Sequence, residues 1–525
     1  MKIVTTKQMA EIENMSEELG VTKKKLMYNA GIAITEKIFE ICLKKKFLIS
    51  KDTSIVFLAG SGNNGGDCFV SAKLLADKNY DVTLINIVNE PSTELAKENF
   101  NKLPENVRII NYWQGENTEK EAALKEIAFA DIVIDGVFGT GFHGELDKNI
   151  IDIFSVETKA YKLSIDIPSG GNGSTGNVSA GTFKADETIC LGCLKFGMTQ
   201  YPLKKFCGKI TVSSIGIPQN AYNIIEGKRE YYQIEGNSQT GFPPEREPDA
   251  HKGTFGTVLV ISGSSLMRGA ASFNVLGALK SGAGIVRLAS VEKCIDTVSV
   301  LAPEATFIEL ESDGNGFMRF DERTEKILYD AVKKSDSIVI GSGMGVTEDT
   351  MEIVRFVVQN SEVPIIIDAD GINCIANDIK ILMGKKSEVI ITPHPGEMAR
   401  LLECDSKMIN ENRVITAEKY AEQYGVTVVL KGAGTIISDC HRTSANNTGN
   451  AGMSKGGSGD VLAGIIGSFV AQGISPYDSA CTGVYIHGLA GDTAAEKFGQ
   501  EAMLPRDIID CLPDSFRILK ENQES

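Results

Sequence analysis

Short apolar runs alternate with amphipathic runs along both halves of the chain, and this alternation limits the folds available to it. Apolar runs such as 54–59 and 131–135 have the length of strands, and the run 118–129 between two of them has helical spacing. Strands that alternate with helices pair in parallel and are covered by helices on both faces. The sequence therefore predicts an α/β protein with layers in the order helix, sheet, helix.

The chain is too long for one hydrophobic core, because it has 525 residues. Its composition changes near 216–252, where the segment 241–248 is rich in proline and charge, as linkers are. We therefore predict one α/β domain over residues 1–218, a linker over 219–244 and a second α/β domain over 245–525.

Composition excludes several classes of partner. The net charge of −16 argues against nucleic acid or an anionic membrane held by bulk electrostatics. No run of about 18 apolar residues is present and the N-terminus lacks the apolar core of a signal peptide, so we expect neither a membrane span nor a leader. The eleven cysteines are scattered, mostly within apolar runs, which suits reduced thiols in the cytoplasm. Cys190 and Cys193 form a lone CxxC motif without the second pair that a zinc site needs.

A glycine-rich segment follows the first predicted strand. Residues 60–67 match G-x-G-x-x-G between a strand and a helix, which is the pattern of dinucleotide-binding folds. Some 45 residues of mostly helical sequence precede that strand, however, and the next strand ends at 87–90 without a clear ribose-binding acid. The segment also carries Asn63, Asn64 and Asp67, which can orient a ligand or coordinate a cation. The alternative is a glycine-rich surface turn.

Two more loops of the first half follow predicted strands, at 135–145 and 166–173. Ligands of parallel sheets bind at the carboxyl ends of the strands, so these loops are candidates for a site. His143 is either an acid–base group or a residue of the rim. Three side chains, one from each strand-end loop, offer oxygen ligands to a hard cation: Asn64, Asp135 and Ser169.

In the second half, the turn Gly456–Asp460 leads directly into an apolar helix. Glycines let backbone N–H groups approach an anion, and the N-terminus of a helix adds positive potential. A carboxylate beside such a site is unexpected. Asp460 is therefore either a general base next to a transferring phosphate or an N-cap that follows a flexible loop.

Other strand ends of the second half carry small or polar residues. The loops 341–345 and 431–435 suit close approach by phosphate or adenine. His394 lies between two prolines that fix its backbone, and its role is either structural or functional. Asp368 either caps a helix or contacts a cation.

Three motifs of the first half resemble the N-terminal domain of the bifunctional NAD(P)H-hydrate repair enzymes. They are S-G-N-N-G-G-D, D-G-V-F-G-T-G-F-H-G-E and S-I-D-I-P-S-G. The resemblance covers roughly residues 1–218 and implies a Rossmann-like epimerase. Its substrate would be NAD(P)HX, whose reduced nicotinamide ring is hydrated at C6, and it would interconvert the R and S forms. By this resemblance the hydrate is held by Asn63, Asn64, Gly65, Gly66, Asp67, Gly139, Thr140, Gly141, Phe142, His143, Gly144, Glu145 and Asp166. A potassium ion is bound by Asn64, Asp135 and Ser169.

Epimerisation at a carbon that bears a hydroxyl beside a ring nitrogen requires proton transfer at the ring. Asp67 and Asp166 are the carboxylates available for this, and the sequence does not order their roles.

Five motifs of the second half extend the resemblance over residues 245–515. They are H-K-G-T-F-G, I-D-A-D-G-I-N, T-P-H-P-G-E, N-T-G-N and K-G-G-S-G-D. They resemble the ribokinase-like fold and, within it, the ADP- or ATP-dependent NAD(P)HX dehydratase. The implied reaction phosphorylates the ring hydroxyl of the S hydrate, and the ring nitrogen then helps to expel phosphate. By resemblance the hydrate contacts Ala270, Gly343, His394 and Asp460. The nucleotide, with Mg²⁺, contacts Lys431, Gly432, Ala433, Gly434, Thr435 and Gly459.

In this interpretation Asp460 accepts the hydroxyl proton, while N–H groups of the glycine turn hold the phosphate. Likeness to bacterial members favours ADP over ATP. We expect a cytoplasmic homo-oligomer that acts on NADHX and NADPHX.

Two other interpretations stay open. One is a sugar or hydroxymethylpyrimidine kinase fused to a Rossmann-like module, which would release a stable phosphorylated product. The other is that the first half is a non-catalytic nucleotide-sensing or interaction module.

Overall fold

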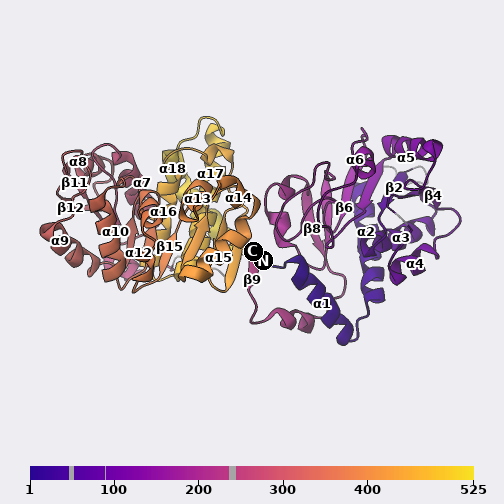
Figure 1. The fold of residues 1–525 in the computed structure, drawn as a ribbon, viewed down its shortest axis with the longest axis horizontal. Coiled ribbons are helices and arrows are strands. Elements are labelled where there is room, and N and C mark those ends of the chain that lie inside the picture. Colours follow the sequence, from indigo (N-terminus) through magenta and orange to yellow (C-terminus); the bar gives the residue numbers. More distant parts are fainter. Residues whose placement is uncertain (46–52, 89, 236–243, 525) are drawn as a thin grey trace. The chain divides into compact units, whose positions relative to one another are not determined.

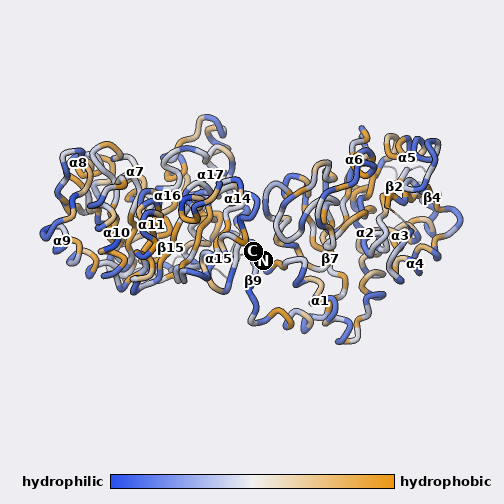
Figure 2. The backbone as a smooth tube through the Cα atoms, in the orientation of Figure 1, coloured by the Kyte–Doolittle hydropathy of each residue, from blue (hydrophilic) through white to orange (hydrophobic). Residues whose placement is uncertain are grey.

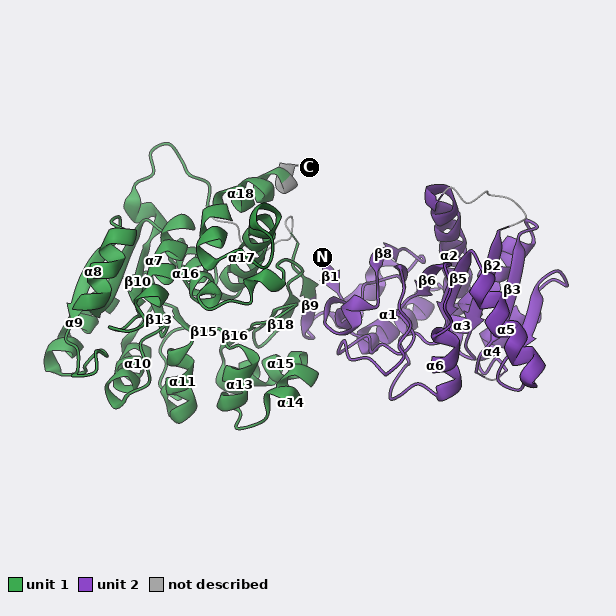
Figure 3. Ribbon diagram, turned by 90° about the horizontal axis from the view of Figure 1, so that it is seen from above, with its two compact units in different colours: residues 1, 232–525 green, residues 2–231 purple. Residues whose placement is uncertain are grey.

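The computed structural model describes residues 1–45, 53–88, 90–235 and 244–524 (Figure 1). The chain forms two compact units (Figure 3): unit 2 is Lys2–Tyr231, and unit 1 is Tyr232–Ser525 together with Met1. The division falls within strand β9 (Glu230–Gln233), inside the range expected as linker. Residues 236–243 of that range lie outside the described residues.

Unit 2 is built on a parallel sheet with the strand order β4-β3-β2-β5-β6-β7-β8. The strands are β2 (Ser54–Ala59), β3 (Asp81–Asn86), β4 (Arg108–Asn111), β5 (Ile132–Gly136), β6 (Tyr161–Ile165), β7 (Glu187–Leu191) and β8 (Lys209–Ser213), after the short β1 (Lys2–Ile3). The helices are α1 (Thr6–Glu18), α2 (Lys23–Lys45), α3 (Asn63–Ala76), α4 (Glu94–Phe100), α5 (Asn117–Phe129) and α6 (Lys148–Phe154), with 3-10 turns η1 (Phe196–Thr199), η2 (Leu203–Lys205) and η3 (Gln219–Ile225).

Side chains alternate across the sheet of unit 2 and feed two separate cores. From β2, Ile55 and Phe57 join a core with α2 and α3, whereas Val56 and Leu58 join a core with α5 and α6. The predicted helix–sheet–helix layering is therefore confirmed. From β2 the chain adds β3 and β4 on one side of that strand, and it then returns to add β5 to β8 on the other side. The strand order therefore reverses between β2 and β5. Such a reversal is where α/β sheets bind ligands.

Unit 1 has a second sheet in which strands follow the order β18-β17-β16-β15-β14-β13-β10-β11-β12. These strands are β10 (Thr257–Ile261), β11 (Ile285–Val291), β12 (Thr306–Leu310), β13 (Ser337–Ile340), β14 (Ile365–Ile367), β15 (Val389–Ile391), β16 (Thr427–Leu430), β17 (Ile436–Ser438) and β18 (Arg442–Ala445). Neighbours from β12 to β16 are parallel, and β17 is antiparallel to β16. Strands β16 and β17 form a hairpin, since the five residues between them are too few for a crossover.

Helices cover both faces of this sheet (Figure 3). The unit 1 helices are α7 (Arg268–Lys280), α8 (Glu292–Leu301), α9 (Glu322–Val332), α10 (Glu348–Asn360), α11 (Asp370–Asn377), α12 (Lys380–Met383), α13 (Pro395–Leu401), α14 (Ser406–Glu411), α15 (Arg413–Tyr424), α16 (Ser458–Ala471), α17 (Pro476–Phe498) and α18 (Pro505–Glu524), with 3-10 turns η4 (Lys252–Phe255) and η5 (Ala451–Met453). Helix α16 packs against the central strands and against α7, α17 and α18. Figure 2 colours the chain by hydropathy, and most residues of α16 are buried. No helix in the described ranges is long and apolar enough to cross a bilayer.

Two candidate active sites

Unit 2 holds a pocket of about 440 Å³ at the carboxyl end of its sheet. Of the residues predicted to hold the hydrate, the pocket is lined by Asn63, Asn64, Asp67, Gly139, Thr140, Gly141, Phe142 and Asp166. The lining does not include Gly65, Gly66, His143, Gly144 and Glu145. His143 is exposed, as the rim interpretation expected, and Glu145 accepts a 2.7 Å hydrogen bond from Ser179.

The first wall of the pocket is the start of α3 rather than a loop. Helix α3 begins at Asn63, so most of the glycine-rich segment 60–67 is already helical. Glycines make the tight entry possible: a Cβ at Gly60 would lie 1.9 Å from the Val137 carbonyl oxygen, and one at Gly65 would lie 1.9 Å from the Gly60 oxygen. The turn therefore passes close to the end of β5 and brings Asn64 beside Phe138.

Asp166 and Lys195 form a buried ion pair in this pocket. Asp166 follows β6 with φ +66°, a strained conformation for a residue with a side chain. Its Oδ1 accepts a hydrogen bond from the Leu191 N–H at 3.1 Å, and the Lys195 ammonium donates to the Leu191 carbonyl at 2.9 Å. Burial alone would lower the pKa of Lys195, but the Asp166 carboxylate raises it above its ordinary value. Lys195 thus stays a cation next to the carboxylate.

Asp67 lies in the same pocket and has the opposite character. Burial, and then the nearby carboxylates of Asp166 and Glu13, raise its pKa well above the ordinary value for an aspartate. The pocket therefore combines a carboxyl group with a raised pKa and a second one that is paired to a lysine. Two carboxyl groups in such different environments suit acid and base roles.

The residues predicted to bind potassium meet behind the pocket. Buried Asp135 accepts hydrogen bonds from Ser169 Oγ at 2.5 Å and from Ser164 Oγ at 2.9 Å, while Asn64 Nδ2 donates to the Phe138 carbonyl at 2.9 Å. Burial raises the pKa of Asp135 to about 6, although its hydrogen bonds oppose the shift. No ion pair to Asp135 occurs among the described residues, so its charge is balanced by dipoles alone.

Glu13 and Lys195 are among the residues of this pocket that the sequence patterns did not indicate. Lys195 follows β7, and the loop after that strand carries no glycine-rich motif that would have drawn attention to it. Glu13 lies on α1, in a helix that precedes the sheet. Placing strand β7 and inspecting its carboxyl end is the observation that would have found Lys195.

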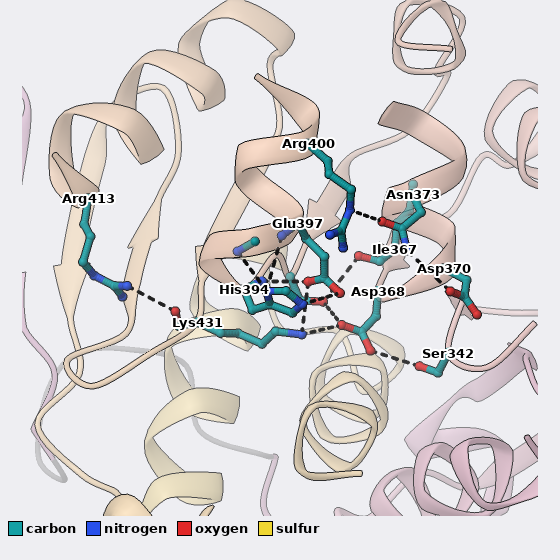
Figure 4. Close-up of polar contacts among 12 residues, drawn as sticks. Ser342, Ile367, Asp368, Asp370, Asn373, His394, Glu397, Arg400, Arg413 and Lys431 are labelled. Carbon is teal, nitrogen blue, oxygen red and sulfur yellow. Dashed lines mark hydrogen bonds and ion pairs between the residues drawn. The ribbon is translucent and has the colours of Figure 1, made fainter. Parts of the chain in front are cut away.

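Unit 1 places its charged residues at the ends of β14, β15 and β16 (Figure 4). Asp368 is 1% exposed, and its Oδ1 lies 2.8 Å from Lys431 Nζ and accepts a 2.6 Å hydrogen bond from Thr392 Oγ1. Its Oδ2 accepts from Ser342 Oγ at 3.0 Å. Burial would raise the pKa of Asp368, but Lys431 and the two hydroxyls hold it below the ordinary value. Asp368 is thus the anchor of Lys431.

Asp460 stands next to this pair. Burial and the Asp368 carboxylate raise its pKa to about 7, against the lowering effect of Lys431. The interpretation of Asp460 as an N-cap is wrong, because Gly457 with φ +102° is the N-cap of α16 and Asp460 is the third residue of that helix. A group that titrates near neutral pH at a helix N-terminus suits a general base.

Close backbone approaches bring the remaining predicted hydrate contacts together. Gly343 has φ +66°, and a Cβ there would lie 2.8 Å from the Cβ of Ala270. A Cβ at Gly459 would lie 3.1 Å from Lys431 Nζ. The first turns of α7 and α16 therefore border the loops after β13 and β16.

His394 is the N-cap of α13. Its Nδ1 accepts hydrogen bonds from the N–H groups of Gly396 at 3.0 Å and Glu397 at 3.3 Å, while Glu397 Oε2 accepts from the His394 N–H at 2.7 Å. Burial lowers the pKa of His394, whose Nε2 lies 3.4 Å from Glu397 Oε1. The structural role that the sequence left open is present, and the side chain as a whole is half exposed, so a ligand can still contact it.

The predicted nucleotide loop connects β16 to β17. Arg413 supports it from α15, with Nη2 2.9 Å from the Leu430 carbonyl and Nη1 3.3 Å from the Lys431 carbonyl. Thr435 Oγ1 donates to the Gly432 carbonyl at 2.9 Å, whereas Gly432 and Ala433 are exposed. The loop is thus fixed at its base and open along its tip.

Both halves of the chain match family models. Residues 23–197 match the family described as YjeF-related protein N-terminus, and residues 258–514 match the family described as NAD(P)H-hydrate dehydratase. A solved structure of the ADP/ATP-dependent NAD(P)H-hydrate dehydratase from Bacillus subtilis, co-crystallised with ATP/Mg²⁺, is 28% identical, with a TM-score of 0.45 over 53% of this chain and 94% of that one.

Curated relatives match over almost the whole length. The bifunctional NAD(P)H-hydrate repair enzyme Nnr of Thermofilum pendens is 32% identical over 97% of this chain and 95% of its own length. The enzyme of the same name from Escherichia coli is 32% identical over 95% of this chain and 90% of its own length. The chain therefore belongs to the family of bifunctional NAD(P)H-hydrate repair enzymes.

Proposed function

We propose that this chain repairs hydrated nicotinamide cofactors in two steps, with one site in each unit. Unit 2 interconverts R- and S-NAD(P)HX, and unit 1 dehydrates the S form at the expense of ADP or ATP. The observation that carries the proposal is the position of the Lys431–Asp368 ion pair against the first turn of α16, which contains Gly459 and Asp460, because it places a base beside an anion site.

In unit 1, Asp460 accepts the proton of the C6 hydroxyl as the terminal phosphoryl group of the nucleotide passes to that oxygen. Lys431 and the N–H groups at the start of α16 stabilise the transferring phosphoryl group. The ring nitrogen then expels phosphate from C6, a proton leaves C5, and the dihydronicotinamide is restored.

We propose that Lys431–Thr435 and Gly459 contact the nucleotide, and that Ala270, Gly343 and His394 contact the hydrate. No cluster of three acidic, histidine or cysteine side chains suited to a metal occurs in the described part of the chain. Mg²⁺ suits a site of this kind when the nucleotide phosphates supply most of its ligands.

In unit 2, the hydroxyl of the R hydrate leaves C6 as water when Asp67 protonates it, assisted by the ring nitrogen. Water returns to C6 from the other face and gives a proton to Asp166. Lys195 forms an ion pair with Asp166 and holds it in place for this task. The predicted hydrate-binding residues that line the pocket, from α3 and the loop after β5, enclose the ring.

Asn64, Asp135 and Ser169 fit a potassium ion. They offer amide, carboxylate and hydroxyl oxygens, and the buried Asp135 lacks a cationic partner in the described structure. Bound there, the ion would neutralise Asp135 and fix the loop after β5. The reducing cytoplasm remains our proposed compartment, since all eleven cysteines are free. NADHX and NADPHX remain the proposed substrates, and a homo-oligomer the predicted assembly.

The test incubates the purified chain with S-NADHX, ADP and Mg²⁺ and follows dihydronicotinamide absorbance together with phosphate. Recovery of the absorbance with one phosphate per cofactor supports the proposal. A stable phosphorylated hydrate without recovered absorbance would instead identify the kinase alternative.

A further inference from the structure

Glu13 is a carboxyl group of the unit 2 pocket with no structural role of its own. It lines the pocket from α1, and within the described residues its side chain makes no hydrogen bond and no ion pair. Two other acids of the same helix are paired: Glu11 lies 3.0 Å from Lys228, and Glu17 lies 3.9 Å from Lys23. An unpaired acid turned into a pocket is costly to keep unless the pocket uses it.

The charged groups that face Glu13 come from four other parts of unit 2. Asp67 belongs to α3, Asp166 follows β6, Lys195 follows β7, and Lys23 begins α2. Burial raises the pKa of Glu13, and the Asp166 carboxylate raises it further, while the two lysines oppose this. Glu13 therefore exchanges a proton at a higher pH than an exposed glutamate, and it lines the same pocket as two other carboxyl groups.

After one turnover of the proposed epimerase mechanism, Asp67 lacks a proton and Asp166 carries an additional one. Each conversion of R to S moves one proton from Asp67, which protonates the leaving hydroxyl, to Asp166, which accepts a proton from the attacking water. Asp67 lies in the pocket wall with 8% of its surface exposed, so direct exchange with bulk water is restricted. The next turnover requires the proton to return.

We propose that Glu13 returns this proton. Through water in the pocket, its carboxyl group gives a proton to the Asp67 carboxylate, and the Asp166 carboxyl group gives its proton to the resulting Glu13 carboxylate. In net terms two carboxyl O–H bonds break and two form, and no bond to carbon changes. The inference rests on the proposed epimerase mechanism of the same pocket.

The test compares Glu13→Gln with Glu18→Gln in the full-length protein. Glutamine has the size of glutamate but cannot carry the proton, and Glu18 is an exposed acid on the same helix. We expect Glu13→Gln to lower kcat for R-to-S conversion by about 10²-fold, with KM unchanged. Formate, a small carboxylic acid, should restore part of the lost kcat in Glu13→Gln and leave the wild type and Glu18→Gln unaffected.

Other results would overturn the inference. A kcat equal to that of Glu18→Gln would remove any role for Glu13, and a loss that formate does not restore would show a structural role instead. Glu13→Asp, which keeps a proton-carrying group, should be more active than Glu13→Gln, and equal inactivity of the two would also overturn the inference. Absence of R-to-S conversion in the wild type would contradict the proposed epimerase function itself.

Discussion

Lys431 Nζ lies 2.8 Å from Asp368 Oδ1, and the same ammonium is the group that a side chain at Gly459 would approach to 3.1 Å. The ion pair therefore joins the ends of β14 and β16 next to the first turn of α16, although the two residues are far apart in sequence. It also acts on the pKa of Asp460, which burial and the Asp368 carboxylate raise and Lys431 lowers.

Removing the lysine should destabilise unit 1. Lys431→Met leaves the buried Asp368 carboxylate without its cation, which costs about 3 to 5 kcal/mol. Because the folded-state pKa of Asp368 is lowered, the stabilisation is present above the unfolded pKa of about 4 and is lost as pH falls through the folded pKa. Calorimetry measures this loss of stability in the unfolding transition of unit 1, which is identified in the wild type as the transition that responds to added nucleotide. In the control, Lys333→Met breaks an exposed pair with Glu362 and should cost less than about 1 kcal/mol. Equal losses in the two variants would contradict the assigned role of Lys431.

Dehydration should depend on the ionisation of Asp460. A general base acts as the carboxylate, so kcat/KM should rise with pH and reach half its plateau near the pKa of about 7. Asp460→Asn should lower kcat by about 10²- to 10⁴-fold and abolish this limb of the profile. The control is Asp330→Asn, an exposed acid of α9. A full-activity Asp460→Asn enzyme would show that another group accepts the proton.

Potassium should stabilise unit 2 through Asp135. An ion that binds only the folded state raises its stability, so the melting temperature should be higher in K⁺ than in N-methylglucamine. Fluorescence of Trp113 follows this transition selectively, because it is the single tryptophan of the chain and belongs to unit 2. Asp135→Asn should remove the K⁺ dependence, whereas Asp152→Asn, on α6, should retain it. A wild type indifferent to K⁺ would exclude the site.

Most strands of the two units and their parallel order were predictable, because buried strands such as β2 and β10 are apolar runs. The start of α3 was not, since two glycines and two asparagines have weak helix propensity and the close passage of Gly60 and Gly65 is a tertiary effect. Strand β12 escaped prediction because its exposed and half-buried residues give it little apolar signal.

The candidate sites divide in a similar way. Motifs located Asp67, Asp166 and Asp460, because each follows or begins an element at the end of a strand. They missed Glu13 and Lys195, whose importance arises from carboxylates distant in sequence. Which aspartate keeps its proton depends on burial and on those neighbours, so the assignment of acid and base required the structure.

The most direct test of the two-site account uses a mixture of R- and S-NADHX with ADP, Mg²⁺ and K⁺. The wild type should convert the whole mixture to NADH, whereas Asp166→Asn should rapidly convert only the S fraction and Asp460→Asn should convert almost none while still equilibrating the two forms. Rapid, complete conversion by Asp166→Asn, or loss of both activities in either variant with the fold intact, would contradict the account.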